Sequence, residues 1–193
     1  MHTNFRQTPR PLSTKGGGSD VIASSSGTET LNGGNGNDLL FGNGGADTIN
    51  GENGADLLVG GAGADILNGG AGNDVLFGGV DNDTFLINTA LNAATNVDTI
   101  TDFNLNGIDK IHLENTGAGL FNALATGALS AGALDIVGAG AAADANTRII
   151  YDPATGALYY DADGVGGVAA VQFATLGTTT HPTTVASTDF VVI

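Results

Sequence analysis

Large apolar residues recur at every ninth position along the first half of the chain. They hold the eighth place of a nine-residue unit, and the eight positions are Ile22, Leu31, Leu40, Ile49, Leu58, Leu67, Leu76 and Phe85. Residues 33–86 contain six such units without an insertion, and residues 15–32 contain two degraded ones. The seventh to ninth places predict a short strand in each unit. Strands at a fixed period would stack their eighth-place side chains into one continuous apolar core.

The first six places of each unit are small or polar. Gly stands near the start and permits positive φ, so the loop can turn tightly and aim several carbonyl oxygens inward. Asp stands at the sixth place of all six good units and adds a carboxylate. Oxygen ligands in flexible geometry suit calcium better than magnesium, which demands stricter octahedral order. In the last unit Asp81 replaces the usual fourth-place Gly, which predicts a distorted loop.

The period stops after Leu86, and the chain divides there. Residues 87–116 alternate apolar and polar positions and predict strands with acidic turns, whereas residues 117–145 predict a short helix or loop. Residues 148–161 predict a hairpin, followed by a strand at 168–176 and by the segment DFVVI. We therefore expect a disordered tail at 1–14, a repeat region at 15–86 and a β-rich cap at 87–193.

The net charge of the chain limits the kinds of molecule that it can bind. The chain has 193 residues, 20 of them acidic and 5 basic, and a formal net charge of −15. Such a chain repels nucleic acid and anionic membranes, so neither is expected as a partner, and it favours cations. Residues 15–86 carry ten acidic residues against Lys15, a net charge of −9. Without metal this composition favours disorder, because little apolar area opposes the chain entropy.

Several site classes are excluded by the residues themselves. Absence of Cys excludes disulfides and Cys-based zinc sites, and no apolar run approaches the ~20 residues of a membrane span. His2, His112 and His181 lie in no HExxH motif, and neither GxSxG nor GK[ST] occurs. We expect no enzyme activity from this chain. The N-terminal residues lack the apolar segment of a conventional signal peptide, so any export signal is expected elsewhere.

The repeat resembles the RTX family of bacterial secreted proteins. The segments RIIYD, TGALYYDADG and DFVVI are similar to the C-terminal module of serralysin-type proteases and other RTX exoproteins. This resemblance implies an all-β fold: a right-handed parallel β-roll with two repeats per turn, followed by a β-rich cap. It also implies calcium between the loops of repeats n and n+2, about six ions in all. One edge would stack Asp20, Asp38, Asp56 and Asp74, and the other Glu29, Asp47, Asp65 and Asp83.

The expected calcium ligands are of two kinds. The carboxylates are the sixth-place Asp20, Asp38, Asp47, Asp56, Asp65, Asp74 and Asp83, with Asp98 and Asp102 at the exit from the roll. The loop carbonyls are those of Gly33, Asn35, Asn37, Gly42, Gly44, Gly51, Asn53, Gly60, Ala62, Gly69, Ala71 and Asn73.

Simpler interpretations stay open for some of these residues. Asp and Asn in Gly-rich loops are usually turn formers, and stacked carboxylates repel one another unless they are neutralised. Two interpretations fit the acidic residues at the exit from the roll equally well: further calcium ligands, or solvated residues of strand turns. These residues are Asp98, Asp102 and Asp109. For Asp161 and Asp163 we favour a plain loop role, because no acidic residue completes an EF-hand-type loop.

The resemblance implies a secreted, extracellular protein. Asp189 followed by four apolar residues is similar to the family's uncleaved type I secretion signal, although the same residues predict a closing strand. We expect a non-catalytic calcium-binding module that leaves the cell through a type I ABC transporter and folds on calcium outside. One alternative is the C-terminal domain of a secreted RTX enzyme, such as a protease, a lipase or a polysaccharide-modifying enzyme. Another is a surface- or biofilm-associated binding protein whose partner the sequence does not name.

Overall fold

A computed structural model describes residues 11–13, 17–105, 108–115, 121–136, 145–164 and 168–193. This part of the chain is built from β-strands and two short 3-10 turns, η1 (Ala131–Ala133) and η3 (Ser187–Asp189). None of its helices has the length and apolar character needed to cross a membrane.

The strands form two sheets. Sheet A has the order β1, β3, β5, β7, β9, β11, β17, β12, with bounds Pro11–Ser13, Thr30–Asn35, Thr48–Asn53, Ile66–Ala71, Thr84–Ile87, Lys110–Leu113, Phe190–Val192 and Gly127–Ala128. Sheet B has the order β13, β14, β15, β16, β10, β8, β6, β4, β2, with bounds Leu134–Ile136, Ile149–Asp152, Ala157–Tyr160, Val171–Leu176, Asp98–Ile100, Val75–Val80, Leu57–Ala62, Leu39–Gly44 and Val21–Ala23.

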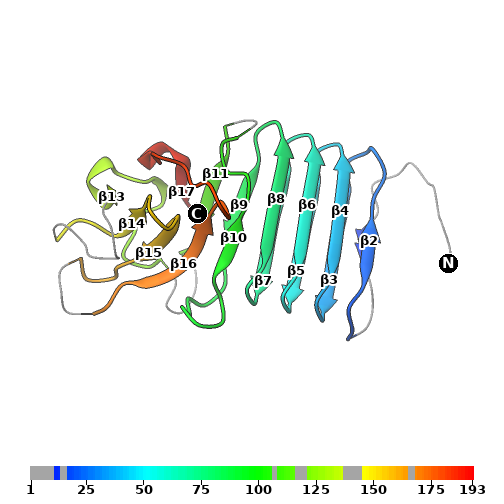
Figure 1. The fold of residues 1–193 in the computed structure, drawn as a ribbon, viewed down its shortest axis with the longest axis horizontal. Coiled ribbons are helices and arrows are strands. Elements are labelled where there is room, and N and C mark those ends of the chain that lie inside the picture. The colour runs from blue at the N-terminus through cyan, green and yellow to red at the C-terminus, as the bar shows by residue number, and fades with distance from the viewer. Residues whose placement is uncertain (1–10, 14–16, 106–107, 116–120, 137–144, 165–167) are drawn as a thin grey trace.

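Successive repeats alternate between the two sheets. In sheet A Leu31 pairs with Ile49 and Ile49 with Leu67, in parallel and eighteen residues apart. In sheet B Leu40 pairs with Leu58 in the same way. Two nonapeptides therefore make one turn, and the parallel β-roll expected from the repeats is confirmed (Figure 1).

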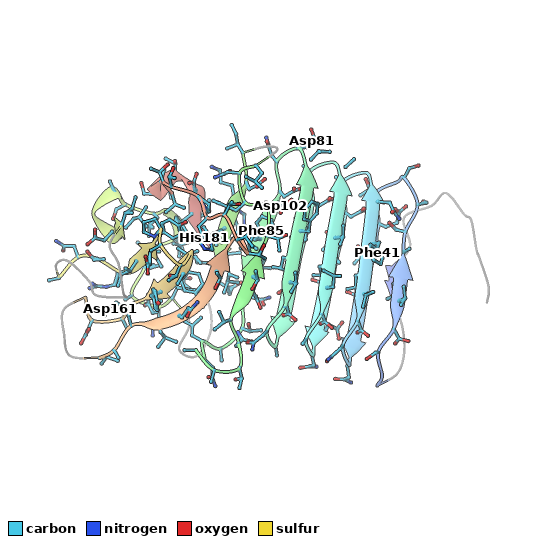
Figure 2. All side chains as sticks on the ribbon, viewed as in Figure 1. Phe41, Asp81, Phe85, Asp102, Asp161 and His181 are labelled. Atoms are coloured by element: carbon cyan, nitrogen blue, oxygen red, sulfur yellow. The ribbon has the colours of Figure 1, made fainter. Side chains whose placement is uncertain are left out.

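The core of the roll lies between the sheets. All eight eighth-place residues are buried, and seven of them are 0 % exposed. The residues on either side of each point outward, because side chains alternate across a strand. Figure 2 shows Phe85 at the last of these positions, where its ring lies 6.3 Å from that of Phe103.

The first strand differs from the sequence expectation. Residues 11–13 were expected in a disordered tail, but they form β1 and pair in parallel with β3. Their pairing supplies hydrogen-bond partners to a strand that would otherwise be the edge of sheet A. Pro11 fits there as the first residue of an edge strand. The other residues of the expected tail, 1–10 and 14, lie outside the described residues.

Both sheets continue past the last repeat. β10 pairs with β8 and β11 pairs with β9, all in parallel, and β16 and β17 extend the sheets further. The boundary expected after residue 86 therefore marks the end of the period and not the end of the roll.

The C-terminal part closes the molecule at the end opposite β2 (Figure 1). The predicted hairpin is present as antiparallel β14 and β15, and the strand predicted at 168–176 is β16. The ring of Phe121 packs edge-on against Tyr160 and Phe173 in the core there. The described part of residues 117–145 holds β12, η1 and β13. The last strand, β17, lies between β11 and β12.

Candidate metal centres

Each repeat buries its sixth-place carboxylate. Asp38, Asp47, Asp56, Asp65, Asp74 and Asp83 are between 0 and 3 % exposed. The residue stands directly before its strand, where the loop turns inward. Its Oδ1 accepts the backbone N–H of the acidic residue one turn earlier, as in the 2.7 Å bond from Asp38 N–H to Asp56. The carboxylate therefore points back into the gap between two turns.

These bonds link the acidic residues into two columns. The first column is Asp20, Asp38, Asp56, Asp74 and Asp98, and the second is Glu29, Asp47, Asp65, Asp83 and Asp109. The bonds range from 2.7 Å to 3.2 Å. The grouping of the eight repeat residues agrees with the two stacks that the family resemblance implied. Asp98 and Asp109 lengthen the stacks beyond the repeats.

The second carboxylate oxygen is unpartnered in six of these residues. They are Glu29, Asp38, Asp47, Asp56, Asp65 and Asp74, three in each column. Each of these oxygens is buried, and none has a hydrogen-bond partner within the described protein. Buried polar atoms are normally satisfied, because an unsatisfied charged group is costly. Such an orphan in every turn points to a ligand that the fold is built to receive.

A first-place glycine borders the free oxygen of each of the five Asp residues in this set. A Cβ on Gly42 would lie 2.6 Å from Oδ2 of Asp47 and 2.5 Å from the carbonyl oxygen of Gly60. A Cβ on Gly33 would lie 2.6 Å from Oδ2 of Asp38 and 2.8 Å from the carbonyl oxygen of Gly51. Glycine therefore leaves room where a carboxylate oxygen and a carbonyl oxygen face the same point. Oxygens converging without a donor between them suit a hard cation.

Side chains alone do not make these sites. In the described part of the chain, no group of three His, Cys, Asp or Glu side chains is placed to hold a metal ion. A cation in either column would therefore draw most of its ligands from backbone carbonyls, which agrees with calcium chemistry.

The fourth and second places provide the tight turns. Gly63 has φ +118° and faces the carbonyl of Gly45 one turn earlier, so only glycine fits there without strain. Glu52, at a second place, adopts φ +75° without being glycine. Asp81, which replaces the fourth-place Gly of the last unit, has a positive φ of 82°, as the glycines at that place do, although side chains rarely adopt this torsion. Figure 2 shows Asp81 in the loop that follows β8.

The asparagines of the loops have another role than the carboxylates. Asn53 donates to the side chain of Asn35 at 3.0 Å, and both are exposed. Oδ1 of Asn37 accepts the N–H of Ala55, and Oδ1 of Asn73 accepts that of Val97. These side chains cross-link successive turns.

The third-place carbonyls among the expected ligands also join the turns. The carbonyl oxygens of Asn35, Asn53, Ala62 and Ala71 accept backbone N–H groups of a neighbouring turn. The first-place carbonyls, such as those of Gly51 and Gly60, are the ones that the structure brings to the free carboxylate oxygens. Among the expected carbonyl ligands, the first-place glycines are therefore the best placed.

Burial and like charge weaken the acidity of the columns. Burial raises the pKa of Asp56 to about 6, and the neighbouring carboxylates of Asp74 and Asp38 add to the rise. Burial likewise raises the pKa of Asp65 to about 6 and that of Asp83 to about 7. For these three residues the charged form is therefore costly in the fold, and a bound cation would remove that cost.

At the exit from the roll, unlike in the repeats, both oxygens of a carboxylate accept hydrogen bonds. Both oxygens of Asp102 accept backbone N–H groups, from Gly78 at 3.0 Å and from Gly79 at 2.8 Å. Oδ2 of Asp109 accepts the N–H of Asn104 at 2.6 Å, while its Oδ1 accepts that of Asp83. These two carboxylates cap free backbone donors at the end of the second column.

The first column ends in a similar cap. Oδ1 of Asn96 accepts the N–H of Gly72, and its amide donates to the hydroxyl of Thr89 at 2.8 Å. That hydroxyl donates to the carbonyl of Gly70 at 2.9 Å. Asp98 lies beside this cap, and its burial raises its pKa to about 8, with the charge of Asp74 adding to the rise.

The sequence left Asp109 open between a further calcium ligand and a solvated turn residue, and it did not place Asp109 in a column. The signal was present, because Asp109 and Ile111 keep the spacing of the sixth and eighth places, as do Asp98 and Ile100. In the C-terminal part, Oδ1 of Asp161 accepts the N–H groups of Asp163 and Gly164, which agrees with the loop role expected for it.

The comparisons with known proteins concern the repeats. The family model of the RTX calcium-binding nonapeptide repeat matches residues 24–58 and 50–85. No curated protein matches the chain. Among solved structures, the chain is similar to the AlgE6R3 subunit of the mannuronan C5-epimerase from Azotobacter vinelandii. The two share 22% sequence identity over 92% of this chain and 80% of that one, with a TM-score of 0.26.

Proposed function

Residues 24–85 belong to the RTX calcium-binding nonapeptide repeat family, and from that premise we propose that the chain is a non-catalytic module that is folded by calcium outside the cell. The observation that carries the proposal is the set of six buried, unpartnered carboxylate oxygens, three in each column. A purely structural solenoid would have no reason to bury an unsatisfied charge in every turn.

We assign the ligands from the two columns of acidic residues. In the first column the sites lie between Asp20 and Asp38, between Asp38 and Asp56, and between Asp56 and Asp74. In the second column the corresponding pairs are Glu29 and Asp47, Asp47 and Asp65, and Asp65 and Asp83. The first-place glycine carbonyls complete these sites. We assign Asp102 a capping role instead of a ligand role, because both of its oxygens already accept backbone donors.

The free energy of calcium binding at about six sites would be large enough to decide whether the roll folds. Extracellular calcium modules commonly bind at roughly 10⁻⁴ to 10⁻³ M. At ten times the dissociation constant, one independent site adds about 1.4 kcal/mol, so about six sites add ~8 kcal/mol. A whole domain is stabilised by about 5–15 kcal/mol, so the module would be folded only where calcium is abundant.

Calorimetric calcium titration with circular dichroism on the same samples tests this function. We expect about six ions to bind with a coil-to-β transition. Asp56→Asn, which removes a free oxygen, should bind one or two ions fewer, whereas Glu52→Gln removes an exposed charge and should bind the wild-type number. A complete β fold in chelator, with little calcium bound, would refute the proposal.

Export is the second part of the proposal. RTX repeats are typical of secreted proteins, and a chain without Cys does not depend on oxidative folding. We assign the export signal to residues 189–193, which would be extended while the chain is unfolded and which contain β17 (Phe190–Val192) after folding. Co-expression with a type I secretion apparatus should place the chain in the medium. Substitution of Phe190 and Val192 by Ser should abolish export even in calcium-free medium, and unchanged export would refute the assignment.

A further inference from the structure

Asparagines that are followed directly by glycine gather in the first strands of sheet A. Four of them lie in β3 and β5, namely Asn32, Asn35, Asn50 and Asn53. We name these four residues the ladder asparagines, because their side chains are joined in pairs across one turn. Asn50 donates to Asn32 at 2.9 Å, and Asn53 donates to Asn35 at 3.0 Å. Each ladder asparagine is therefore both a cross-link between turns and one half of an Asn–Gly pair.

An Asn–Gly pair contains both reactants of a deamidation. The backbone nitrogen of the Gly attacks the side-chain amide carbon of the Asn, which closes a five-membered succinimide and expels the amide nitrogen as ammonia. Water then opens the ring at one of its two carbonyls and leaves aspartate or isoaspartate. The net change converts one amide and one water into one carboxylic acid and one ammonia. Gly favours the attack, because it has no Cβ to restrict the backbone or to shield the nitrogen.

The folded roll engages the reacting groups elsewhere. The N–H of Gly36 donates to the carbonyl of Asn53 at 2.9 Å, and the N–H of Gly54 donates to the carbonyl of Ala71 at 2.9 Å. The side-chain amide of Asn53 is held by Asn35. Asn35 and Asn53 are both exposed, so their protection comes from hydrogen bonds and not from burial. In the folded state the attack therefore requires a local opening of the turns.

Isoaspartate would break the register of the first turns. Asn53 accepts the N–H of Gly36 through its backbone carbonyl, and three residues later Asp56 accepts the N–H of Asp38. In isoaspartate the main chain runs through the side-chain carbon, so residue 53 gains one main-chain atom and its former backbone carbonyl becomes a free carboxylate. The eighteen-residue period has no place for that atom, and the carboxylate of Asp56 would be displaced from the first column.

We propose that the ladder asparagines are deamidation sites that the folded roll keeps closed, and that a chain left unfolded converts them irreversibly and loses the capacity to rebuild its first turns. Water is the only co-reactant, so the reaction needs no enzyme. Calcium controls the reaction only if it folds the roll, and this part rests on the proposed function. A chain that waits without calcium then has a limited time in which to fold.

Peptide mapping by mass spectrometry after parallel incubations tests the protection. Three samples share one mildly alkaline pH: the chain in calcium, in chelator, and in calcium with guanidinium chloride. We expect Asn35 and Asn53 to be converted about tenfold or more faster in guanidinium chloride than in calcium, because the folded roll reacts only when it opens. Asn37 and Asn73 precede Asp in loops of the same kind and should be converted far more slowly in the denatured sample. Equal rates for the ladder asparagines in calcium and in guanidinium chloride would overturn the proposal.

The chelated sample separates this inference from the proposed function. If circular dichroism shows the chelated chain unfolded, its rates should match those in guanidinium chloride, and rates as slow as in calcium would overturn the inference. If the chelated chain is already folded, its rates should match those in calcium. That result would refute the calcium switch and would support protection by the roll.

Refolding measures the consequence of the reaction. Chains aged in guanidinium chloride and diluted into calcium should bind fewer ions than chains aged in calcium and denatured only briefly before the same dilution. Equal binding would overturn the predicted loss of the first turns. A variant with Ala at all four ladder positions should fold in calcium, because Ala62 and Ala71 already occupy the third place of later units. It should lose less binding on ageing, and a loss equal to that of the wild type would contradict the assignment to these residues.

Discussion

Replacing Asp56 by Asn should have opposite effects with and without calcium. The substitution keeps the shape of the side chain and keeps Oδ1, which accepts the N–H of Asp38 at 2.7 Å. It replaces the unpartnered Oδ2 by an uncharged amide. The variant therefore loses a calcium ligand, and it also loses the buried charge that calcium would neutralise.

The magnitudes follow from the structure. The pKa of Asp56 is about 6 against an ordinary 3.8, so holding this group charged in the calcium-free fold costs up to about 3 kcal/mol above pH 7. Asp56 belongs to two successive pairs of the first column. At ten times the dissociation constant two lost sites remove about 3 kcal/mol, so wild type and variant should be equally stable near that concentration. Below it the variant is more stable, and above it the wild type is.

Urea unfolding at a series of free calcium concentrations measures this crossing, with circular dichroism as the signal. Where the chelated wild type is largely unfolded, the folded fraction replaces the midpoint. Glu52→Gln serves as the control, because it removes an exposed charge from the same region. If Asp56 were only a turn former, its Asn variant would behave like the wild type at every calcium concentration. Parallel calcium dependences for the two proteins would therefore refute the reasoning.

Three further predictions concern the fold. Gly63→Ala should destabilise the calcium-loaded protein by more than about 2 kcal/mol, because its Cβ would meet a carbonyl oxygen of the preceding turn, whereas Gly132→Ala meets nothing within 4 Å and should be nearly neutral in urea unfolding. Leu58→Ala, in the core between the sheets, should cost about 2–5 kcal/mol, and the outward-facing Leu57→Ala should cost less than about 1 kcal/mol in the same assay. In chelator, the folded state should gain stability as the pH falls from about 8 towards about 4. Raised carboxyl pKa values, such as that of Asp98 at about 8, mean that the folded state binds more protons than the unfolded state in this range. Calcium titrations should show affinity falling over the same range, because protons compete for the carboxylates, and a flat pH dependence of both would contradict the assignment.

The periodic half of the fold could be predicted because its information is local. Residues nine positions apart occupy the same place of the repeat, and each place is assigned to the core, to a loop or to the solvent-exposed surface. Leu40 and Leu58 therefore lie in equivalent positions, whatever the rest of the chain does. The two columns follow from the same argument once two repeats are assigned to a turn. That assignment came from family resemblance and is confirmed by the eighteen-residue register.

The exit from the roll depends on contacts between residues far apart in sequence. Asp98 follows Asp74 by 24 residues and Asp109 follows Asp83 by 26, so no period indicates that they continue the columns. Asp102 was expected to be a ligand, and only the folded chain shows both of its oxygens on backbone N–H groups. Whether an oxygen is free or satisfied depends on which donors folding brings to it.

Within the repeats, the sequence by itself determined the strands, the core, the spacing of the acidic residues and the tight turns of the loops, since each follows from residue type at a fixed interval. Tertiary structure decided where the sheets end. β1 covers the edge of β3, and β16 joins β10 across more than 70 residues, because open sheet edges are satisfied by whichever segment folding brings alongside. It also decided that six carboxylate oxygens of the two columns have no hydrogen-bond partner among the described residues. The reason is that burial and hydrogen bonding belong to the assembled turns and not to any one repeat.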